Sequence, residues 1–280
     1  MATDGATGLM LVDVSAETKR PHRLRVPQFA QHWIVPMAVV AVWEVAYRAG
    51  FIRTLAMPPP SRIGLTLVAL LLSGQLFVHV AASLSRVLEG FAIAGALGLS
   101  VGVLMGISAT VTRLLDVTIQ LLRPIPPIAW IPLAILWFGI GEASKIYIIF
   151  LGALFPIVVS TIEGIRQTDD RFVELARVLS VTRSKFIRKV VVPGALPAIM
   201  TGLRVGLGNA WVCVVAAELI AAESGVGYII VDGRELSRPD VVIAGMISIG
   251  VIGKLMDVGL KHLEARLNRW KRTYHGEEGG

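Results

Sequence analysis

The chain of 280 residues is long enough for one or two soluble domains, but 54% of its residues are hydrophobic and only 17% are charged. With a mean hydropathy of +0.69, it carries more apolar side chain than a soluble core can bury. The net charge of +7 is typical of a protein that binds nucleic acid or lies in a membrane, and the single cysteine, Cys213, excludes a disulfide framework and a Cys-rich zinc site. We therefore expect an all-α membrane protein with several spans.

Six stretches are apolar enough to cross a bilayer, which takes a helix of about 20 mostly apolar residues. The expected spans are residues 33–52, 83–107, 125–138, 146–165, 195–220 and 241–260. The first contains Glu44 and Arg48, which are four residues apart and can pair. An amphipathic piece, residues 63–72, precedes the second, and four prolines from Pro124 to Pro132 break the third.

The distribution of Lys and Arg orients the spans, because cytoplasmic loops carry an excess of both. With the N-terminus inside, the cytoplasmic segments hold 18 of these cations and the outer segments hold five. We expect a cytoplasmic tail at residues 1–32, a six-span membrane domain at 33–260 with a basic loop at 166–194, and a second cytoplasmic tail at 261–280. This topology accounts for most of the positive charge, and the sequence shows no basic patch interleaved with aromatic residues, so we expect no nucleic-acid partner.

Small residues follow one face of the second span at every fourth position. They are Gly90, Ala94, Gly98, Gly102 and Gly106. In lipid, such a stripe lets two helix backbones approach closely. We expect it to pack within the chain, and the alternatives are a dimer seam or a moving gate.

Two pairs of charged residues lie at the outer side of the membrane. Arg86 and Glu89, at the start of the second span, are three residues apart and can pair, and Glu142 lies next to Lys145. We expect the first pair at the interface and the second in a short outer turn.

Polar residues inside the fifth span usually face protein or a wet cavity. Arg204 lies near the inner end of this span, where snorkelling, contact with the basic loop and a role in a transport path all remain open. Asn209 lies further along the same span. Glu218 and Glu223, at its outer end, indicate a water-facing mouth.

Enzyme motifs are missing from the sequence. Gly253-Lys254 is followed by Leu255, so there is no G-x-x-x-x-G-K-[ST] phosphate loop. The five histidines are scattered and predict no metal site. Residues 226–228, Val-Gly-Tyr, match part of a potassium selectivity filter without its next glycine, and we interpret them as a turn. We expect no catalytic residue, metal or cofactor in this chain, so any ATP dependence must come from a partner.

The basic loop between the fourth and fifth spans contains a short amphipathic helix. Asp169 or Asp170 can cap it, and an apolar face follows at helical spacing. The residues of this face are Phe172, Leu175, Ala176 and Leu179. Such a helix suits docking into a groove of another protein or lying on lipid headgroups, and the spacing alone does not separate the two.

This loop resembles the cytoplasmic signature of the membrane subunits of bacterial ABC importers. That signature begins E-A-A, has a glycine four residues after the last alanine, and continues through I-x-L-P to a second proline. The matching residues here are Glu174-Leu175-Ala176, Ser180, Phe186, Val190, Pro193, Pro197 and residues 202–204. Leu175 and Ser180 depart from the commonest pattern.

Two further stretches resemble one branch of that family, the permeases for aliphatic sulfonates, taurine, nitrate and related solutes. One runs from Arg123 through the prolines to Glu142, and the other covers residues 216–228, followed by 240–242 and 253–257. The resemblance extends from about Met57 to Arg272. It implies a type I importer permease fold with six transmembrane helices and a cytoplasmic coupling helix.

The resemblance also implies partners and a place in the cell. The chain would form a homodimer in the bacterial inner membrane, with both termini cytoplasmic. Two cytosolic ABC ATPases would bind ATP and Mg, and a periplasmic solute-binding protein would deliver a small anionic solute. An aliphatic sulfonate or taurine is the expected solute. Nitrate, bicarbonate or another small solute is the alternative, and a stand-alone secondary transporter is the rival from another class.

Two groups of residues follow from this resemblance. The ATPase-coupling residues would be Phe172, Glu174, Leu175, Ala176, Leu179, Ser180, Pro193 and Pro197. The candidates for the translocation path, in the broken third span and the fifth span, are Arg123, Pro127, Trp130, Trp137, Arg204, Asn209, Trp211 and Glu218. Irregular backbone at membrane depth is tolerated where it borders a cavity.

Overall fold

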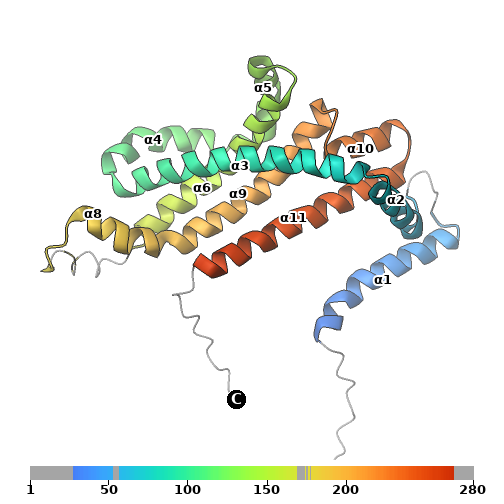
Figure 1. Cartoon of the computed structure of the whole chain (residues 1–280), viewed down its shortest axis with the longest axis horizontal. Helices are drawn as coiled ribbons and strands as arrows, with labels where there is room; N and C mark the ends of the chain where they lie inside the picture. The colour runs from blue at the N-terminus through green and yellow to red at the C-terminus, as the bar shows by residue number, and fades with distance from the viewer. Residues whose placement is uncertain (1–27, 53–56, 169–173, 175, 177, 268–280) are drawn as a thin grey trace, which may run out of the picture.

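The computed structural model describes residues 28–52, 57–168, 174, 176 and 178–267, and every regular element in this part of the chain is a helix. The elements, most of which are labelled in Figure 1, are α1 (Gln28–Arg48), α2 (Pro60–Leu72), α3 (Gln75–Ile107), α4 (Ala109–Leu122), the 3-10 helix η1 (Pro127–Trp130), α5 (Ile131–Phe138), α6 (Glu142–Arg166), α8 (Arg183–Phe186), the π-helix η2 (Ile187–Val191), α9 (Val192–Ala221), α10 (Val226–Glu235) and α11 (Pro239–Leu267).

Four helices in the described residues are long and apolar enough to cross a membrane: Gln75–Ile107, Glu142–Arg166, Ser184–Ile220 and Pro239–Arg266. They coincide with the second, fourth, fifth and sixth expected spans. A fifth span results if α4 and the η1–α5 segment are counted together across their 87° bend. The first expected span falls on α1, whose 21 residues include the predicted ion pair of Arg48 Nε with Glu44 Oε1 at 2.9 Å. Length and composition therefore give four or five spans where the sequence predicted six, and α1 is not among them.

The segment before the broken span differs from the prediction. Residues 109–122 were expected in a cytoplasmic loop, but they form α4, whose first turn is capped by the Ser108 hydroxyl accepting a hydrogen bond from the Val111 N–H. The chain then turns sharply because Pro124, Pro126 and Pro127 cannot continue a helix. Arg123 consequently lies at the bend between α4 and η1.

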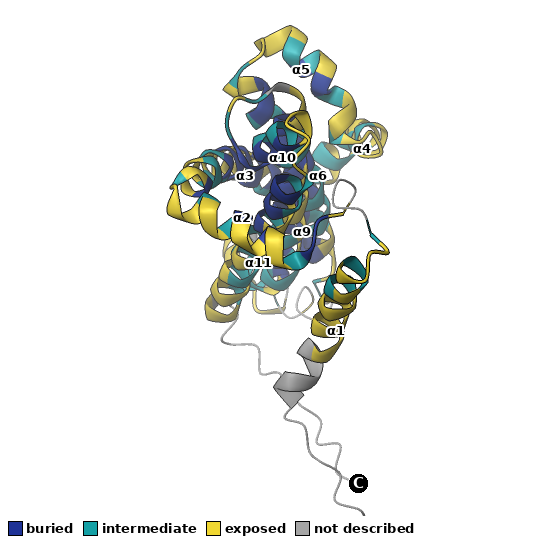
Figure 2. Ribbon diagram, turned by 90° about the vertical axis from the view of Figure 1, so that its right-hand side faces the viewer, coloured by how far each residue is buried: buried dark blue, intermediate teal, exposed yellow. Residues whose placement is uncertain are grey.

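The core of the molecule is the contact of α3, α6 and α9. Its buried apolar residues include Val87 and Ala94 from α3, Ile149 from α6, and Leu207 and Val214 from α9. Figure 2 shows buried residues gathered where these helices meet, whereas α1 and α4 are largely exposed. Exposed apolar residues such as Leu114 and Val117 on α4 are what a chain surrounded by lipid requires.

The glycine stripe of α3 packs within the chain, as the sequence predicted. A Cβ atom added at Gly90 would lie 2.6 Å from a methyl of Ile149, and one added at Gly102 would lie 2.6 Å from the Cβ of Thr161. Gly98 and Gly106 make the same approach to Ile157 and Ile165, all on α6. Because these positions of α3 carry no side chain, the backbones of α3 and α6 can approach closely.

We predict that Gly102→Ala destabilises the protein by about 1–3 kcal/mol, because the new methyl group overpacks the contact with Thr161. Thermal unfolding of the purified protein in detergent measures this effect. Gly95→Ala is the matched control on the same helix, since its Cβ would meet nothing within 4 Å. Equal melting temperatures for the two variants would contradict the packing role of the stripe.

Candidate functional site

The basic loop joins the end of α6 to the start of α9 at one end of the bundle (Figure 1). Of the expected apolar face, Phe172 and Leu175 lie outside the described residues. Glu174 and Ala176 are helical, as predicted, and Glu174 is exposed while Ala176 is half-buried. Leu179, expected on the apolar face, is 63% exposed in the isolated chain. An apolar side chain in that state is available for contact with another molecule.

Ser180 ends this helix in the way that a glycine would. Its φ of 51° is in the left-handed region, and the Val181 N–H donates to the Ala176 carbonyl oxygen at 2.9 Å. This six-to-one hydrogen bond is the C-terminal cap that normally has glycine at the left-handed position. The substitution of serine for the expected glycine therefore keeps the tight turn at the cost of some backbone strain.

The loop joins α9 through a stretch of unusual helix. Residues Ile187–Val191 form a π-helix, in which the Val192 N–H donates to the Ile187 carbonyl oxygen. Pro193 follows in the first turn of α9, where its missing N–H is tolerated, and Pro197 lies one turn further on. Pro197, inside α9, therefore removes one backbone hydrogen bond near the point where the loop meets the span.

A cavity of about 400 Å³ lies at the bend of the broken span. Arg123 and Pro127 line it from the bend, and Asn209 lines it from α9. Its third wall belongs to α6, where Pro156 has no N–H to donate to the Gly152 carbonyl oxygen. Three of the predicted path residues thus come together around one space.

The cavity carries both signs of charge. Glu163 of α6 and Arg123 both line it, and Ser160 and Asn209 add uncharged polar groups. Sequence reasoning missed Glu163, although its place near the inner end of the fourth span could have marked it. This mixture suits a small polar solute better than an apolar one.

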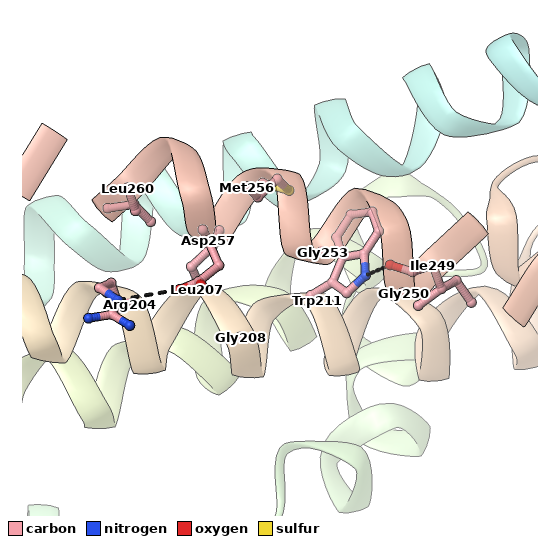
Figure 3. Close-up of a pocket in the computed structure, with 10 residues that line it drawn as sticks. All are labelled: Arg204, Leu207, Gly208, Trp211, Ile249, Gly250, Gly253, Met256, Asp257 and Leu260. Carbon is pink, nitrogen blue, oxygen red and sulfur yellow. Dashed lines mark hydrogen bonds and ion pairs between the residues drawn. The ribbon is translucent and has the colours of Figure 1, made fainter. Parts of the chain in front are cut away.

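Two other predicted path residues, Arg204 and Trp211, lie in a different place. They line a groove of about 340 Å³ between α9 and α11 (Figure 3). Arg204 pairs there with Asp257 at 3.3 Å and with Glu264 at 3.4 Å, and Trp211 Nε1 donates to the Ile249 carbonyl oxygen at 3.0 Å. The structure therefore shows Arg204 in contact with acidic groups of α11, a pairing that the sequence did not predict.

The remaining tryptophan candidates join the apolar part of the fold. Trp130 packs beside the core from η1. Trp137 of α5 is half-exposed, and its ring lies 6.0 Å from that of Tyr147 on α6. These rings brace the short helix α5 against α6, and neither tryptophan is among the residues that line the cavity.

The opposite end of the bundle is held by a buried ion pair. Arg86 Nη1 donates to Glu218 Oε1 at 2.8 Å and to the Ser224 carbonyl oxygen at 2.7 Å. Arg86 Nη2 donates to Glu142 Oε1 at 2.8 Å, and Lys145 pairs with the same carboxylate at 3.0 Å. Glu142 was expected in a short outer turn, but it begins the helix α6. A single guanidinium therefore joins α3, α6, α9 and the turn before α10.

This arrangement corrects two expectations. Arg86 pairs across the bundle with Glu142 and Glu218, although the sequence predicted a local pair with Glu89, because a planar guanidinium reaching inward can bind two carboxylates at once. Glu218, expected at a water-facing mouth, has a side chain that is 0% exposed. Its neutralising partner comes from another helix, which spacing along one helix does not reveal.

Residues 226–228, in which the sequence predicted a turn, lie instead against the Glu218 carboxylate. Val226 begins the helix α10, and the Gly227 N–H donates to Glu218 Oε2 at 2.9 Å. Gly225 has a φ of 124°, and an added Cβ would lie 2.3 Å from a carboxylate atom of Glu218. Ser83, which sequence reasoning also missed, donates to Glu218 at 2.7 Å from one turn before Arg86. Glycine at positions 225 and 227 therefore lets the backbone approach the buried Glu218 carboxylate closely.

Comparison with known proteins places these features in a family. Residues 94–269 match the family model described as binding-protein-dependent transport system inner membrane component. The chain is 41% identical over 276 residues to the putative aliphatic sulfonates transport permease protein SsuC of Bacillus subtilis, covering 99% of this chain and 100% of that one. It is 43% identical over 246 residues to the Escherichia coli protein of the same name, covering 88% of this chain and 94% of that one.

A third relative and a solved structure extend the comparison. The taurine transport system permease protein TauC of Escherichia coli is 39% identical over 244 residues, covering 85% of this chain and 87% of that one. An inward-facing conformation of the MetNI methionine ABC transporter shares the fold with a TM-score of 0.63 at 20% identity, covering 71% of this chain and 98% of that one.

We predict that Arg86→Met destabilises the protein by about 3–5 kcal/mol, because it leaves the Glu218 carboxylate buried without its cation. Glu142→Gln removes the charge of the other partner of Arg86. The Glu142 side chain is 57% exposed, so this change should lower the free energy of unfolding by only about 1 kcal/mol or less. Thermal unfolding in detergent measures both variants. A loss for Glu142→Gln as large as that for Arg86→Met would show that burial of Glu218 is not what matters.

Proposed function

The chain belongs to the family of binding-protein-dependent transport system inner membrane components, and we propose that it is the permease subunit that moves an aliphatic sulfonate or taurine into the bacterial cytoplasm. One observation carries the choice of solute. Over most of their length, two relatives named for aliphatic sulfonates and one named for taurine are 39% to 43% identical to this chain. Nitrate or bicarbonate is the alternative solute.

The cavity at the bend suits this class of solute. A sulfonate group carries a negative charge on three oxygens, which the Arg123 guanidinium and the Asn209 amide can bind in passing. Glu163 on the same cavity would attract the ammonium group of taurine. The solute would pass along the broken span, because its prolines leave backbone groups free beside the cavity.

Energy for transport would come from a partner subunit. The sequence contains no phosphate loop, so we assign ATP and Mg binding and ATP hydrolysis to two cytosolic ABC ATPases. The helix around Glu174 and Ala176 would dock in the ATPase, and the exposed Leu179 beside it supports this role. The π-helix and Pro193 would pass its movement to α9.

The remaining assembly follows from the same proposal. A second copy of this chain would close the path, which is open at the cavity in one copy, to make a homodimer. A periplasmic solute-binding protein would deliver the solute at the end held by Arg86. Both termini would be cytoplasmic, on the side of the basic loop.

Reconstitution in proteoliposomes with the partner ATPase and solute-binding protein tests the substrate class. We expect ATP-dependent uptake of taurine or an alkanesulfonate, and stimulation of ATP hydrolysis by the same solutes. If nitrate, bicarbonate or a cationic solute stimulates hydrolysis and sulfonates do not, the substrate class is wrong while the permease assignment stands. Gradient-driven flux by this chain alone would instead support a secondary transporter.

A pair of arginine variants controls this experiment. Arg123→Gln should lower sulfonate uptake about fivefold, because one favourable charge contact near 1 kcal/mol is lost in the cavity. Arg113→Gln removes the same charge from α4, whose Arg113 is exposed and outside the lining of the cavity, and should leave uptake unchanged.

We predict that Ala176→Trp uncouples ATP hydrolysis from transport. A bulky ring at a close-packed interface costs about 1–3 kcal/mol, so coupled uptake should fall about tenfold or more while the protein still reaches the membrane. Glu174→Arg should act in the same direction by reversing a charge on the docking helix. Normal uptake in both variants would defeat the coupling assignment.

Ser180→Gly is the control for the two loop variants. Glycine adopts the left-handed conformation of this position without strain, so uptake should be retained.

A further inference from the structure

The groove between α9 and α11 is separate from the cavity at the bend. Leu207 of α9 and Ile249, Met256 and Leu260 of α11 give it apolar walls. Figure 3 shows Arg204 toward one end and Trp211 toward the other. These two residues are seven positions apart on one helix, so the groove runs for about 10 Å along it.

Two glycines keep the groove open. A Cβ atom added at Gly208 or at Gly250 would meet nothing within 4 Å, and neither residue has a positive φ. No close approach of a neighbouring helix and no turn therefore requires glycine here, although glycine weakens a helix relative to alanine. The space left by the missing side chains is the groove itself.

Charged residues of both signs lie at the end of the groove near Arg204, where Arg204 and Asp257 line it and Lys254 and Lys261 flank it. Asp257 pairs with Arg204, with Lys261 at 3.0 Å and with Lys254 at 3.7 Å. Glu264 is the second acid and lies 3.4 Å from Arg204. Three cations thus face two acids, and the side chains of Lys254 and Lys261 are 67% and 46% exposed, so both can still donate to another anion.

Exposed apolar side chains surround the groove on α11. Met246, Val251 and Leu255 of α11 are all more than half exposed in the isolated chain. An apolar groove that opens among such residues and ends in exposed cations matches the two parts of a phospholipid, an acyl chain and an anionic head group. Basic pockets between spans are known to bind anionic lipids in this way.

We propose that this groove binds one anionic phospholipid, with an acyl chain along Gly208 and Gly250 and the phosphate held by Lys254, Lys261 and Arg204. The lipid belongs to the leaflet on the side of the α6–α9 loop, because α9 begins and α11 ends on that side. The site is independent of the solute that the permease carries.

Native mass spectrometry of the full chain tests the proposal. The delipidated protein is mixed with phosphatidylglycerol or with phosphatidylcholine, and we expect one phosphatidylglycerol to bind preferentially per chain. Removing the two lysines with Lys254→Gln and Lys261→Gln should lower its affinity about fivefold per cation at low salt. Lys185→Gln with Lys189→Gln removes two exposed cations elsewhere and should leave it unchanged.

A second pair of variants tests the apolar part of the groove. Gly250→Leu should abolish the preference by filling the space, whereas Gly259→Leu adds the same side chain to α11 outside the groove lining, where its Cβ also meets nothing. Thermal unfolding confirms that both variants fold. Equal binding of lipid by these two variants would overturn the site.

The position of the acyl chain is measured through Trp211. In nanodiscs, phosphatidylglycerol with brominated chains should quench the part of the fluorescence that Trp211→Phe removes, and brominated phosphatidylcholine should quench it less. Equal quenching by the two lipids would overturn the proposal. Crosslinking of Gly250→Cys to the same residue of a second copy would do so as well, because the groove would then be a contact between copies.

Discussion

The close approach of α3 and α9 to the two sides of α6 is the contact on which the rest of the structure depends. In lipid there is no hydrophobic driving force that brings helices together, so these helices must gain stability from tight packing. Gly102 of α3 meets Thr161, and Gly202 of α9 meets Ser160 on the neighbouring position of α6. Gly152 of α6 in turn admits the sulfur of Cys213. Glycines of α3 at one contact, and glycines of both α6 and α9 at the other, hold α6 in the centre.

A central α6 leaves α9 with two different faces. Asn209 and Val205 face the cavity at the bend, whereas Leu207, Gly208 and Trp211 face the groove beside α11. Residues one to six positions apart therefore belong to separate spaces, one polar and one mostly apolar. This division is why the path candidates, which share a helix, do not share a site.

The sequence predicts the fold well and the long-range pairs poorly. Apolar length located α3, α6, α9 and α11, with helix ends up to eight residues from the expected bounds, and the glycine spacing predicted the packing face of α3. Periodicity along one helix cannot show that Arg86 reaches Glu218, which lies 132 positions away, nor that Gly225 is a glycine because that carboxylate touches it. The bend at Arg123 was predicted only in part. The prolines after Arg123 indicated a break, but the helix α4 before it was not expected.

The two ends of the bundle are joined with very different strength. At one end Arg86 fixes α3, α6 and α9 through buried charges, and at the other Arg204 links α9 to α11 through half-exposed ones. Under the proposed coupling, the end of α9 nearest the loop would move most and the end held by Arg86 would move least. The 30 residues of α9 span about 45 Å. The cavity at the bend lies partway along this helix, so it would open by only a part of the movement made at the loop.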